Sequence, residues 1–407
     1  MTSSSKLVSQ GTITTPRGFL AGVTYAGIKK PDVDALDLGI LYSEVPCVAA
    51  GVFTTNRIKA ASVILCQRHL ENNKAQAIVV NSGCANACTG EEGLVDAEEV
   101  AAITAKKLGL SPREVLVAST GVIGIPLPMG LIRSSIEKII VSRENGHNLA
   151  KAITTTDRFP KETAVQVVLG HREGEIAIGG IAKGSGMIHP DLATFLCFLT
   201  TDAAVEPGFL KGALRKAADV SFNMITIDGD TSPNDSVIIL ANGLAGNEMI
   251  ESGSPGAAEF EEALETACLS LAKSIARDGE GATKLIEVTV EGALTISDAR
   301  QGARVVSGSS LVKAAVHGSD PNWGRIIAAM GRSGTEMVES KTDLYIDNLC
   351  VMKAGRPHPF DRAQAKSVLD KAEVPIRVCL NLGDATATAW GCDLSEEYVT
   401  INSEYTT

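Results

Sequence analysis

Short apolar runs alternate with longer amphipathic segments along most of this chain. The apolar runs, each typical of a buried strand, lie at residues 47–53, 77–83, 114–120, 164–170, 175–182, 236–243, 286–293, 344–352, 376–383 and 387–394. Between them, apolar residues recur with helical spacing and predict helices over residues 96–110, 130–145, 207–225, 257–279 and 307–318. A further short run, residues 397–400, also has the pattern of a strand. Interleaved strands and helices predict an α/β architecture.

The helix predicted over residues 257–279 has the clearest periodicity. Its apolar residues are spaced three and four apart, which places them on one buried face: Phe260, Leu264, Ala267, Leu271 and Ile275. Gly279 and Gly281 follow and predict the end of this helix, leaving Glu280 on a turn. A glutamate between two glycines is usually solvated. The alternative is that Glu280 holds the amino group of a substrate.

Composition and charge narrow the class of protein. With 407 residues, 44% of them hydrophobic, the chain can bury the core of one large α/β body or of two or three domains. A net charge of −11 and only 4% aromatic residues argue against a nucleic-acid partner. The first residues lack the pattern of a signal peptide, and no apolar run approaches the roughly 20 residues of a membrane helix. We therefore expect a soluble, cytoplasmic protein without a membrane partner.

Neither the cysteines nor the aspartates form a metal motif. The nine cysteines are mostly in apolar runs, which predicts buried free thiols. Cys84 and Cys88 are four residues apart, whereas common redox and zinc pairs are separated by two residues. Asp228, Asp230 and Asp235 are close in sequence, but their spacing does not match a calcium-binding EF-hand loop. We expect these aspartates to cap backbone groups of a tight loop.

A threonine interrupts the apolar segment in the middle of the chain. Thr194 follows Ala193 and precedes Phe195, downstream of a glycine-rich stretch. One interpretation is a buried threonine whose hydroxyl bonds a nearby carbonyl. The other is a nucleophile, which requires an adjacent base. A cut before Thr194 would supply that base as a new α-amino group with a pKa of roughly 8, and the Thr194 hydroxyl could make the cut by attacking the Ala193 carbonyl.

A second candidate for chemistry follows the strand predicted at residues 114–120. There the chain carries Ser119, Thr120 and Gly121. A turn at the end of a strand exposes backbone N–H groups, and Thr120 adds a hydroxyl, so the parts of an oxyanion hole are present. A plain strand-to-helix turn explains the same residues equally well.

The segment KGSGMIHPDLATFLCFLTTDA, residues 183–203, closely resembles the self-cleavage segment of the ornithine acetyltransferase family, the glutamate N-acetyltransferases of arginine biosynthesis. The family pattern is K-G-S-G-M-I-x-P-x-[LM]-A-T-[ML]-L, from which this chain departs at Phe195. The resemblance extends over nearly the whole chain, through segments that include GVFTTNRIKAA, VNSGCANACTG, STGVIG, TTTDRFPK, DGDTSPNDS, ARDGEGATK, HGSDPNWGRIIAAMGRSG and INSEYTT.

The resemblance implies an α/β sandwich with helices outside stacked β-sheets. It implies a precursor that cuts itself between Ala193 and Thr194, which gives two chains, residues 1–193 and residues 194–407. These chains would stay together, and a heterotetramer with two copies of each is expected. Thr194 would carry the acetyl group, and Thr120 and Gly121 would form the oxyanion hole. The residues that match substrate contacts of the family are Thr156, Lys183, Thr194, Glu280, Asn402 and Thr407. No metal or organic cofactor is implied.

The reaction implied is acetyl transfer in two steps. N-acetylornithine would donate its acetyl group to Thr194, and glutamate would then accept it, which is a ping-pong mechanism. Both substrates carry an α-carboxylate, with which Lys183 could pair. Whether acetyl-CoA is a second donor is left open. Two alternatives are a self-processing aminopeptidase or amidase with an N-terminal nucleophile, in which water is the acceptor, and a non-catalytic ligand-binding protein in which Thr194 belongs to the core.

Overall fold

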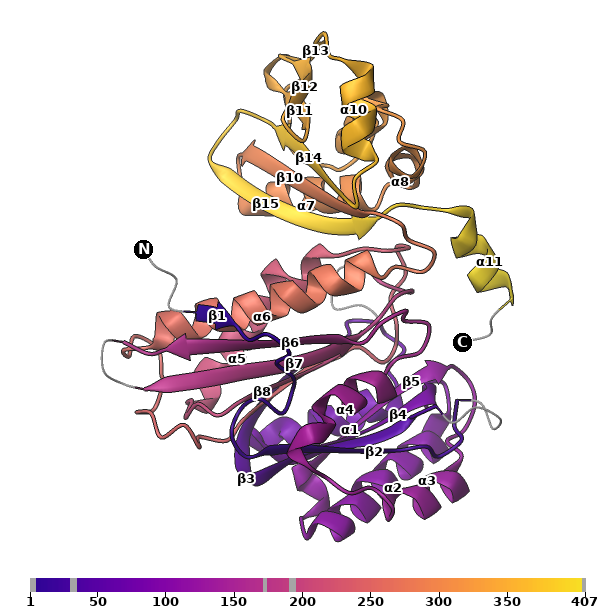
Figure 1. The fold of residues 1–407 in the computed structure, drawn as a ribbon, viewed down its shortest axis with the longest axis vertical. Helices are drawn as coiled ribbons and strands as arrows, with labels where there is room; N and C mark the ends of the chain where they lie inside the picture. The colour runs from indigo at the N-terminus through magenta and orange to yellow at the C-terminus, as the bar shows by residue number, and fades with distance from the viewer. Residues whose placement is uncertain (1–4, 30–34, 171–173, 190–194, 405–407) are drawn as a thin grey trace.

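The computed structural model describes residues 5–29, 35–170, 174–189 and 195–404. Within these residues, nine strands form one sheet in the order β1-β6-β7-β8-β9-β3-β4-β5, with β2 paired to β3 (Figure 1). The strands are β1 (Ser5–Leu7), β2 (Phe19–Thr24), β3 (Leu38–Phe53), β4 (Lys74–Cys84), β5 (Val115–Val122), β6 (Lys161–Val168), β7 (Glu175–Lys183), β8 (Leu196–Thr201) and β9 (Ser236–Ala241).

A second sheet is formed by the C-terminal part of the chain. Between residues 285 and 392, six strands pair in the order β13-β12-β11-β14-β10-β15. These strands are β10 (Leu285–Ala293), β11 (Asp343–Ile346), β12 (Leu349–Lys353), β13 (Arg356–Pro357), β14 (Glu373–Cys379) and β15 (Ala385–Cys392). Figure 1 shows this sheet stacked on the larger one, with helix α6 between them.

Helices cover the faces of both sheets. Helix α6 contacts β6 and β7 of the larger sheet and β15 of the smaller one, whereas α7 packs against β10 and β15. The helices are α1 (Ala61–His69), α2 (Gly90–Leu108), α3 (Met129–Ile136), α4 (Gly146–Ala152), α5 (Pro207–Val220), α6 (Ala257–Arg277), α7 (Ile296–Ser307), α8 (Ser310–His317), α9 (Trp323–Gly331), α10 (Arg362–Leu369) and α11 (Glu396–Glu404). Among the described helices, none combines the length and apolarity that a membrane crossing needs.

The start of strand β8 shows why residues 195–199 are apolar at every position. Phe195 and Cys197 pack into the core that contains α5 and α6, whereas Leu196 and Phe198 pack into a core on the opposite face of the sheet. The strand is also central, since it pairs antiparallel with β7 and parallel with β9. A strand that is buried on both faces has a continuous apolar sequence instead of an alternating one.

The predicted α/β class with stacked sheets is confirmed, and the structure adds that α6 contacts both sheets. The helix predicted over residues 130–145 is wrong in its second half. Helix α3 ends at Ile136, and Ser142 instead exchanges two backbone hydrogen bonds with Ala21 of β2. Pairing with the edge of a sheet overrides a local helical pattern.

The strand predicted at residues 397–400 is also wrong, because these residues lie in helix α11. Glu396 and Glu397 occupy its first turn, where negative charge stabilises the positive end of the helix dipole. Two adjacent apolar residues, Tyr398 and Val399, are too few to establish a period. The cysteine prediction holds for most positions: all nine thiols are free and six are buried, while Cys88 is exposed.

Candidate active site

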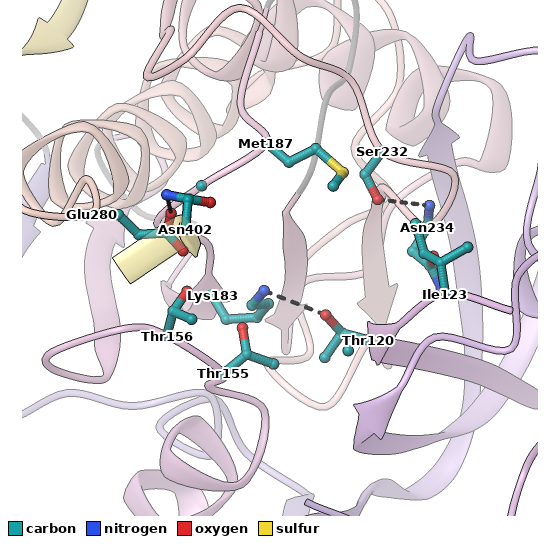
Figure 2. Close-up of a pocket in the computed structure, with 12 residues that line it drawn as sticks. Thr120, Ile123, Thr155, Thr156, Lys183, Met187, Ser232, Asn234, Glu280 and Asn402 are labelled. Carbon is teal, nitrogen blue, oxygen red and sulfur yellow. Dashed lines mark hydrogen bonds between the residues drawn. The ribbon is translucent and has the colours of Figure 1, made fainter. Parts of the chain in front are cut away.

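One pocket collects residues from distant parts of the sequence (Figure 2). It is lined by Thr120, Gly121, Ile123, Thr155, Thr156, Lys183, Gly186, Met187, Ser232, Asn234, Glu280 and Asn402. The structure thus brings together six residues that the sequence analysis singled out, namely Thr120, Gly121, Thr156, Lys183, Glu280 and Asn402. Ala193, Thr194 and Thr407 lie outside the described residues.

Thr120 and Gly121 occupy the C-terminal end of β5. This strand runs parallel to β4, and their register shifts where Gly83 and Cys84 lie opposite Thr120 and Gly121. Gly121 has a φ of 128°, and a Cβ atom there would lie 2.3 Å from the carbonyl carbon of Gly83. Only glycine accepts this backbone conformation and this close approach. The irregularity in the pairing therefore turns the end of β5 toward the pocket.

Asn234 connects this strand end to the neighbouring loop. Its buried Nδ2 donates to the carbonyl oxygens of Ala85, at 2.6 Å, and Ser119, at 2.7 Å. The sequence pattern draws attention to the aspartates near Asn234 but not to Asn234 itself, nor to four other residues of the pocket, Thr155, Met187, Ser232 and Ile123. No spacing rule identifies an asparagine whose two acceptors come from segments more than 100 residues away.

Lys183 is the last residue of β7 and pairs in register with Leu196 of β8. The residue is buried, and its Nζ donates to Thr120 Oγ1 at 3.3 Å. Burial lowers the pKa of Lys183, and the nearby Asp157 carboxylate opposes that shift. Figure 2 shows the Lys183 and Thr120 side chains pointing toward one another, with Glu280 and Asn402 at the other side of the pocket.

A buried ion network lies beside Lys183. The Nζ atom of Lys161 is 2.6 Å from both Asp157 Oδ1 and Asp278 Oδ2, and all three side chains are fully buried. Asp157 also accepts backbone hydrogen bonds from Thr155, at 3.0 Å, and Gly184, at 2.7 Å. Burial alone would raise the pKa of Asp157, but Lys161 and Lys183 outweigh it, and the pKa falls to about 2. The network therefore ties three turns that border the pocket to one another.

The opposite side of the pocket is formed by a turn and a helix. Glu280 follows α6, and its backbone N–H donates to Ser185 at 2.8 Å. Its carboxylate accepts a hydrogen bond from Asn402 Nδ2 of α11, also at 2.8 Å. A Cβ atom on Gly186 would lie 2.6 Å from that carboxylate. A side chain at position 186 would therefore clash with Glu280, and glycine avoids this clash. Thr156 is fixed there by a 2.6 Å hydrogen bond between its hydroxyl and that of Ser185.

Of the three aspartates in the loop at residues 228–236, Asp228 caps backbone groups, as predicted. Asp228 accepts hydrogen bonds from the backbone N–H groups of Met187, at 2.5 Å, Ile188, at 2.9 Å, and Asp230, at 3.2 Å. Burial raises the pKa of Asp228. The pKa of Tyr398 is raised to about 12, by burial and by the nearby carboxylates of Asp228 and Glu280. Within the described ranges, no group of three or more His, Cys, Asp or Glu side chains is arranged to hold a metal ion.

Comparison with known proteins finds relatives along the whole chain. The model of the ArgJ family matches residues 20–407. The arginine biosynthesis bifunctional protein ArgJ of Dehalococcoides mccartyi is 53% identical over 408 residues, covering 100% of both chains. That of Symbiobacterium thermophilum is 53% identical over 98% of this chain and 99% of the relative. A crystal structure of ArgJ from Bacillus halodurans, 47% identical with a TM-score of 0.50, covers 51% of this chain and 97% of that chain.

Proposed function

The chain belongs to the ArgJ family, and on that premise we propose that it transfers an acetyl group from N-acetylornithine to glutamate through an ester on Thr194. The observation that carries this proposal is the pocket. Six of the residues that the family resemblance assigns to chemistry or substrate contact come from five separate segments, yet they line one cavity. A protein in which Thr194 is only part of the core would not require that convergence.

The position of β8 supports Thr194 as the nucleophile. Phe195, which follows Thr194 in the sequence, is buried and stacks on Phe222 with ring centroids 4.5 Å apart. Leu196 is paired in register with Lys183, which lines the pocket. The strand that follows Thr194 in the sequence is therefore fixed next to a residue of the pocket. In the proposed mechanism the Thr194 hydroxyl attacks, and the Thr194 α-amino group, free after cleavage, takes the proton.

The end of β5 supplies the proposed oxyanion hole. Thr120 contributes a hydroxyl and Gly121 a backbone N–H at a strand end that borders the pocket. Donors held by a β-sheet need no reorganisation when negative charge develops on the carbonyl oxygen, and a site that excludes water strengthens them. Thr120 is only 8% exposed, which fits this requirement.

The opposite side of the pocket fits the amino group of ornithine. Glu280 presents a carboxylate that is held by Asn402, and Thr156 adds a hydroxyl nearby. An ammonium group pairs with a carboxylate and donates hydrogen bonds to hydroxyl oxygens. We propose that Thr156, Glu280, Asn402 and Thr407 hold the substrates.

Two observations support cleavage into chains that remain associated. The crystallised Bacillus halodurans chain is matched over 97% of its length yet covers only 51% of this chain, as expected if that relative exists as separate polypeptides. In this structure β7 and β8, from the two sides of the expected cut, are neighbours in one sheet. The pairing would hold the two pieces together. The heterotetramer and the cytoplasmic location stay predictions.

A denaturing gel with N-terminal sequencing tests the proposal. The purified protein should run as two bands of about 20 and 22 kDa, from average residue masses, and the larger should begin Thr-Phe-Leu-Cys. Thr194→Ala should give one band near 42.5 kDa and no acetyl transfer, while Thr194→Ser should retain part of both activities. A fragment that begins at any other residue would overturn Thr194 as the nucleophile.

A second donor is supported by the relatives, which are named bifunctional. We propose acetyl-CoA as that donor. Glutamate and acetyl-CoA, without N-acetylornithine, should give N-acetylglutamate in an assay read by mass spectrometry. Acetate alone, formed from either donor in the presence of glutamate, would favour the aminopeptidase or amidase alternative, because water would then be the acceptor.

A further inference from the structure

The hydrogen bond between Lys183 and Thr120 decides where the Thr120 proton can point. An ammonium group has three donors and no acceptor, so Lys183 Nζ must be the donor in its 3.3 Å contact with Thr120 Oγ1. Once the Thr120 oxygen accepts this bond, its own hydrogen has to point elsewhere. Thr120 lines the pocket, and the pocket is where an oxyanion would form.

We propose that Lys183 is a positioning residue of the oxyanion hole: its ammonium group orients and polarises the Thr120 hydroxyl so that this hydroxyl donates into the pocket. The inference rests on the proposed acetyl transfer. It differs from the role that the family resemblance implies for Lys183, which is contact with the substrate. In this proposal the charge of Lys183 acts on the reaction through Thr120.

The surroundings of Lys183 favour this role over pairing with a substrate carboxylate. The residue is only 5% exposed, so little of it is accessible to a ligand. Three carboxylates, those of Asp157, Asp235 and Glu280, and one cation, Lys161, interact electrostatically with it. The carboxylates outnumber the cation, so a substrate carboxylate that approached Lys183 would also meet negative charge. A neutral hydroxyl such as that of Thr120 meets no such repulsion.

The same surroundings keep Lys183 in place. Its backbone is paired to β8 at Leu196, and the next residue, Gly184, donates its N–H to Asp157 Oδ1 at 2.7 Å. Asp157 is itself held by Lys161 at 2.6 Å. Burial disfavours the charged form of Lys183 and lowers its pKa, and the neighbouring carboxylates offset this effect in part. A buried charge fixed in this way can stabilise a transition state without reorganising.

The step in which Lys183 assists is the attack on N-acetylornithine. The Thr194 oxygen forms a bond to the acetyl carbon, and the carbonyl electron pair moves onto its oxygen. That oxyanion accepts hydrogen bonds from the Thr120 hydroxyl and the Gly121 N–H. When it collapses, the bond from carbon to nitrogen breaks and the leaving amine of ornithine takes the proton that left Thr194. Lys183 exchanges no proton in this step.

A double-mutant cycle tests the proposal. Lys183→Met keeps the length of the side chain and removes the ammonium group. We expect kcat to fall roughly 10- to 100-fold, less than for loss of an oxyanion donor itself, with little change in KM. The same substitution should have less than about a twofold effect in Thr120→Ala, and its full effect in Thr120→Ser, which keeps the hydroxyl. A raised KM with unchanged kcat, or equal effects in all three backgrounds, would overturn the inference.

A donor without a carboxylate separates the two roles further. p-Nitrophenyl acetate should acetylate Thr194, measured as release of p-nitrophenol and as the mass of one acetyl group on the fragment that begins at Thr194. Lys183→Met should slow this acetylation as much as it slows transfer from N-acetylornithine. Acetylation at the wild-type rate would show that Lys183 serves the substrate carboxylate, and the inference would be wrong.

Two controls keep the tests interpretable. Each variant is first checked for two bands on a denaturing gel and for an unchanged unfolding temperature. If Lys183→Met does not fold, Lys183→Gln replaces it, because the glutamine side chain retains an N–H donor. The kcat of Lys183→Gln should then lie between that of wild type and the lowered value expected for Lys183→Met. A wild-type fragment that never gains an acetyl group would overturn the proposed function itself, whereas acetylation that is equal in wild type and the Lys183 variant would overturn only this inference.

Discussion

The two sides of the pocket are built in different ways. One side, here called the wall, consists of Thr120, Gly121 and Lys183 at the ends of β5 and β7, which belong to the nine-stranded sheet of the described chain. The other side, the rim, consists of Glu280 on a turn and Asn402 on α11, a helix with no buried residue. The wall is held by strand pairing, of β5 with β4 and of β7 with both β6 and β8. The rim lies outside the strands and is held by the backbone hydrogen bond from Glu280 to Ser185 and by the exposed side chain of Asn402.

This difference matches what the two sides are proposed to do. Charge that develops during acyl transfer is stabilised best by donors that are fixed and shielded from water. Recognition of the substrate amino group at the rim should depend less on each single contact, because an exposed ion pair contributes only about 0–1 kcal/mol. The same change should therefore cost more at the wall than at the rim, and the following experiments test that expectation.

The largest effect is expected at Thr120. Thr120→Ala removes a hydroxyl that is proposed to bind the oxyanion, and kcat for acetyl transfer should fall roughly 10²–10³-fold. KM for N-acetylornithine should change little, since the hydroxyl acts in the transition state. Steady-state kinetics measure both constants, with Thr120→Ser as the control that keeps the hydroxyl. Normal turnover in Thr120→Ala would remove Thr120 from the oxyanion hole.

The next largest effect is expected at residues 405–407, which belong to neither the wall nor the rim, because the family resemblance places Thr407 at the substrate. Removing them should lower transfer by about 10²-fold, the scale of a misplaced substrate group. Self-cleavage should survive better, since it needs only the neighbourhood of Thr194. Equal transfer rates with and without these residues would remove Thr407 from the site and weaken the case for Asn402.

The ion network behind the wall should make stability depend on pH. The pKa of Asp157 is about 2 in the folded protein against an ordinary 3.8, so its charged form stabilises the fold above pH 4, and this contribution is lost as pH falls toward 2. The difference corresponds to about 2 kcal/mol. The gap in the free energy of unfolding between wild type and Asp157→Asn should therefore narrow as the pH is lowered from 5.

Urea unfolding at several pH values measures this gap. The matched control is Glu261→Gln, which removes the carboxylate of an ion pair between Lys216 and Glu261 in which the lysine side chain is 71% exposed. Its effect on the free energy of unfolding should stay small at every pH. A constant gap for Asp157→Asn would mean that Asp157 does not hold the low pKa in the folded protein.

The smallest effect is expected at the rim. Asn402→Ala removes the 2.8 Å hydrogen bond to Glu280 but leaves the carboxylate in place. KM for N-acetylornithine should rise less than about tenfold, the scale of one hydrogen bond to a charged group, while kcat stays unchanged. Ser403→Ala, in the same exposed helix, should behave like wild type. A large loss of kcat in Asn402→Ala would mean that the rim takes part in the chemistry.

Much of the fold and part of the site could be predicted from the sequence. The buried strands and the long helix α6 follow from periodicity, since burial on one face or two dictates where apolar residues recur. Thr120, Gly121 and Glu280 attracted attention because a hydroxyl or a charge among glycines at the end of an element is unusual. The family resemblance added Thr156, Lys183 and Asn402, which no local pattern distinguishes from ordinary surface or core residues.

The sequence by itself determined which segments are apolar and which hydroxyls and charges are candidates for chemistry, because these properties depend on neighbours along the chain. Only the tertiary structure decided which of those side chains meet. Lys183 and Thr120 are 63 residues apart, and their contact exists because β5 and β7 end at the same pocket. Likewise, three charged side chains can be buried only because they pair with one another, namely Lys161, Asp157 and Asp278. Desolvation penalises each charge alone, and the compensating partner is supplied by the fold from another part of the chain.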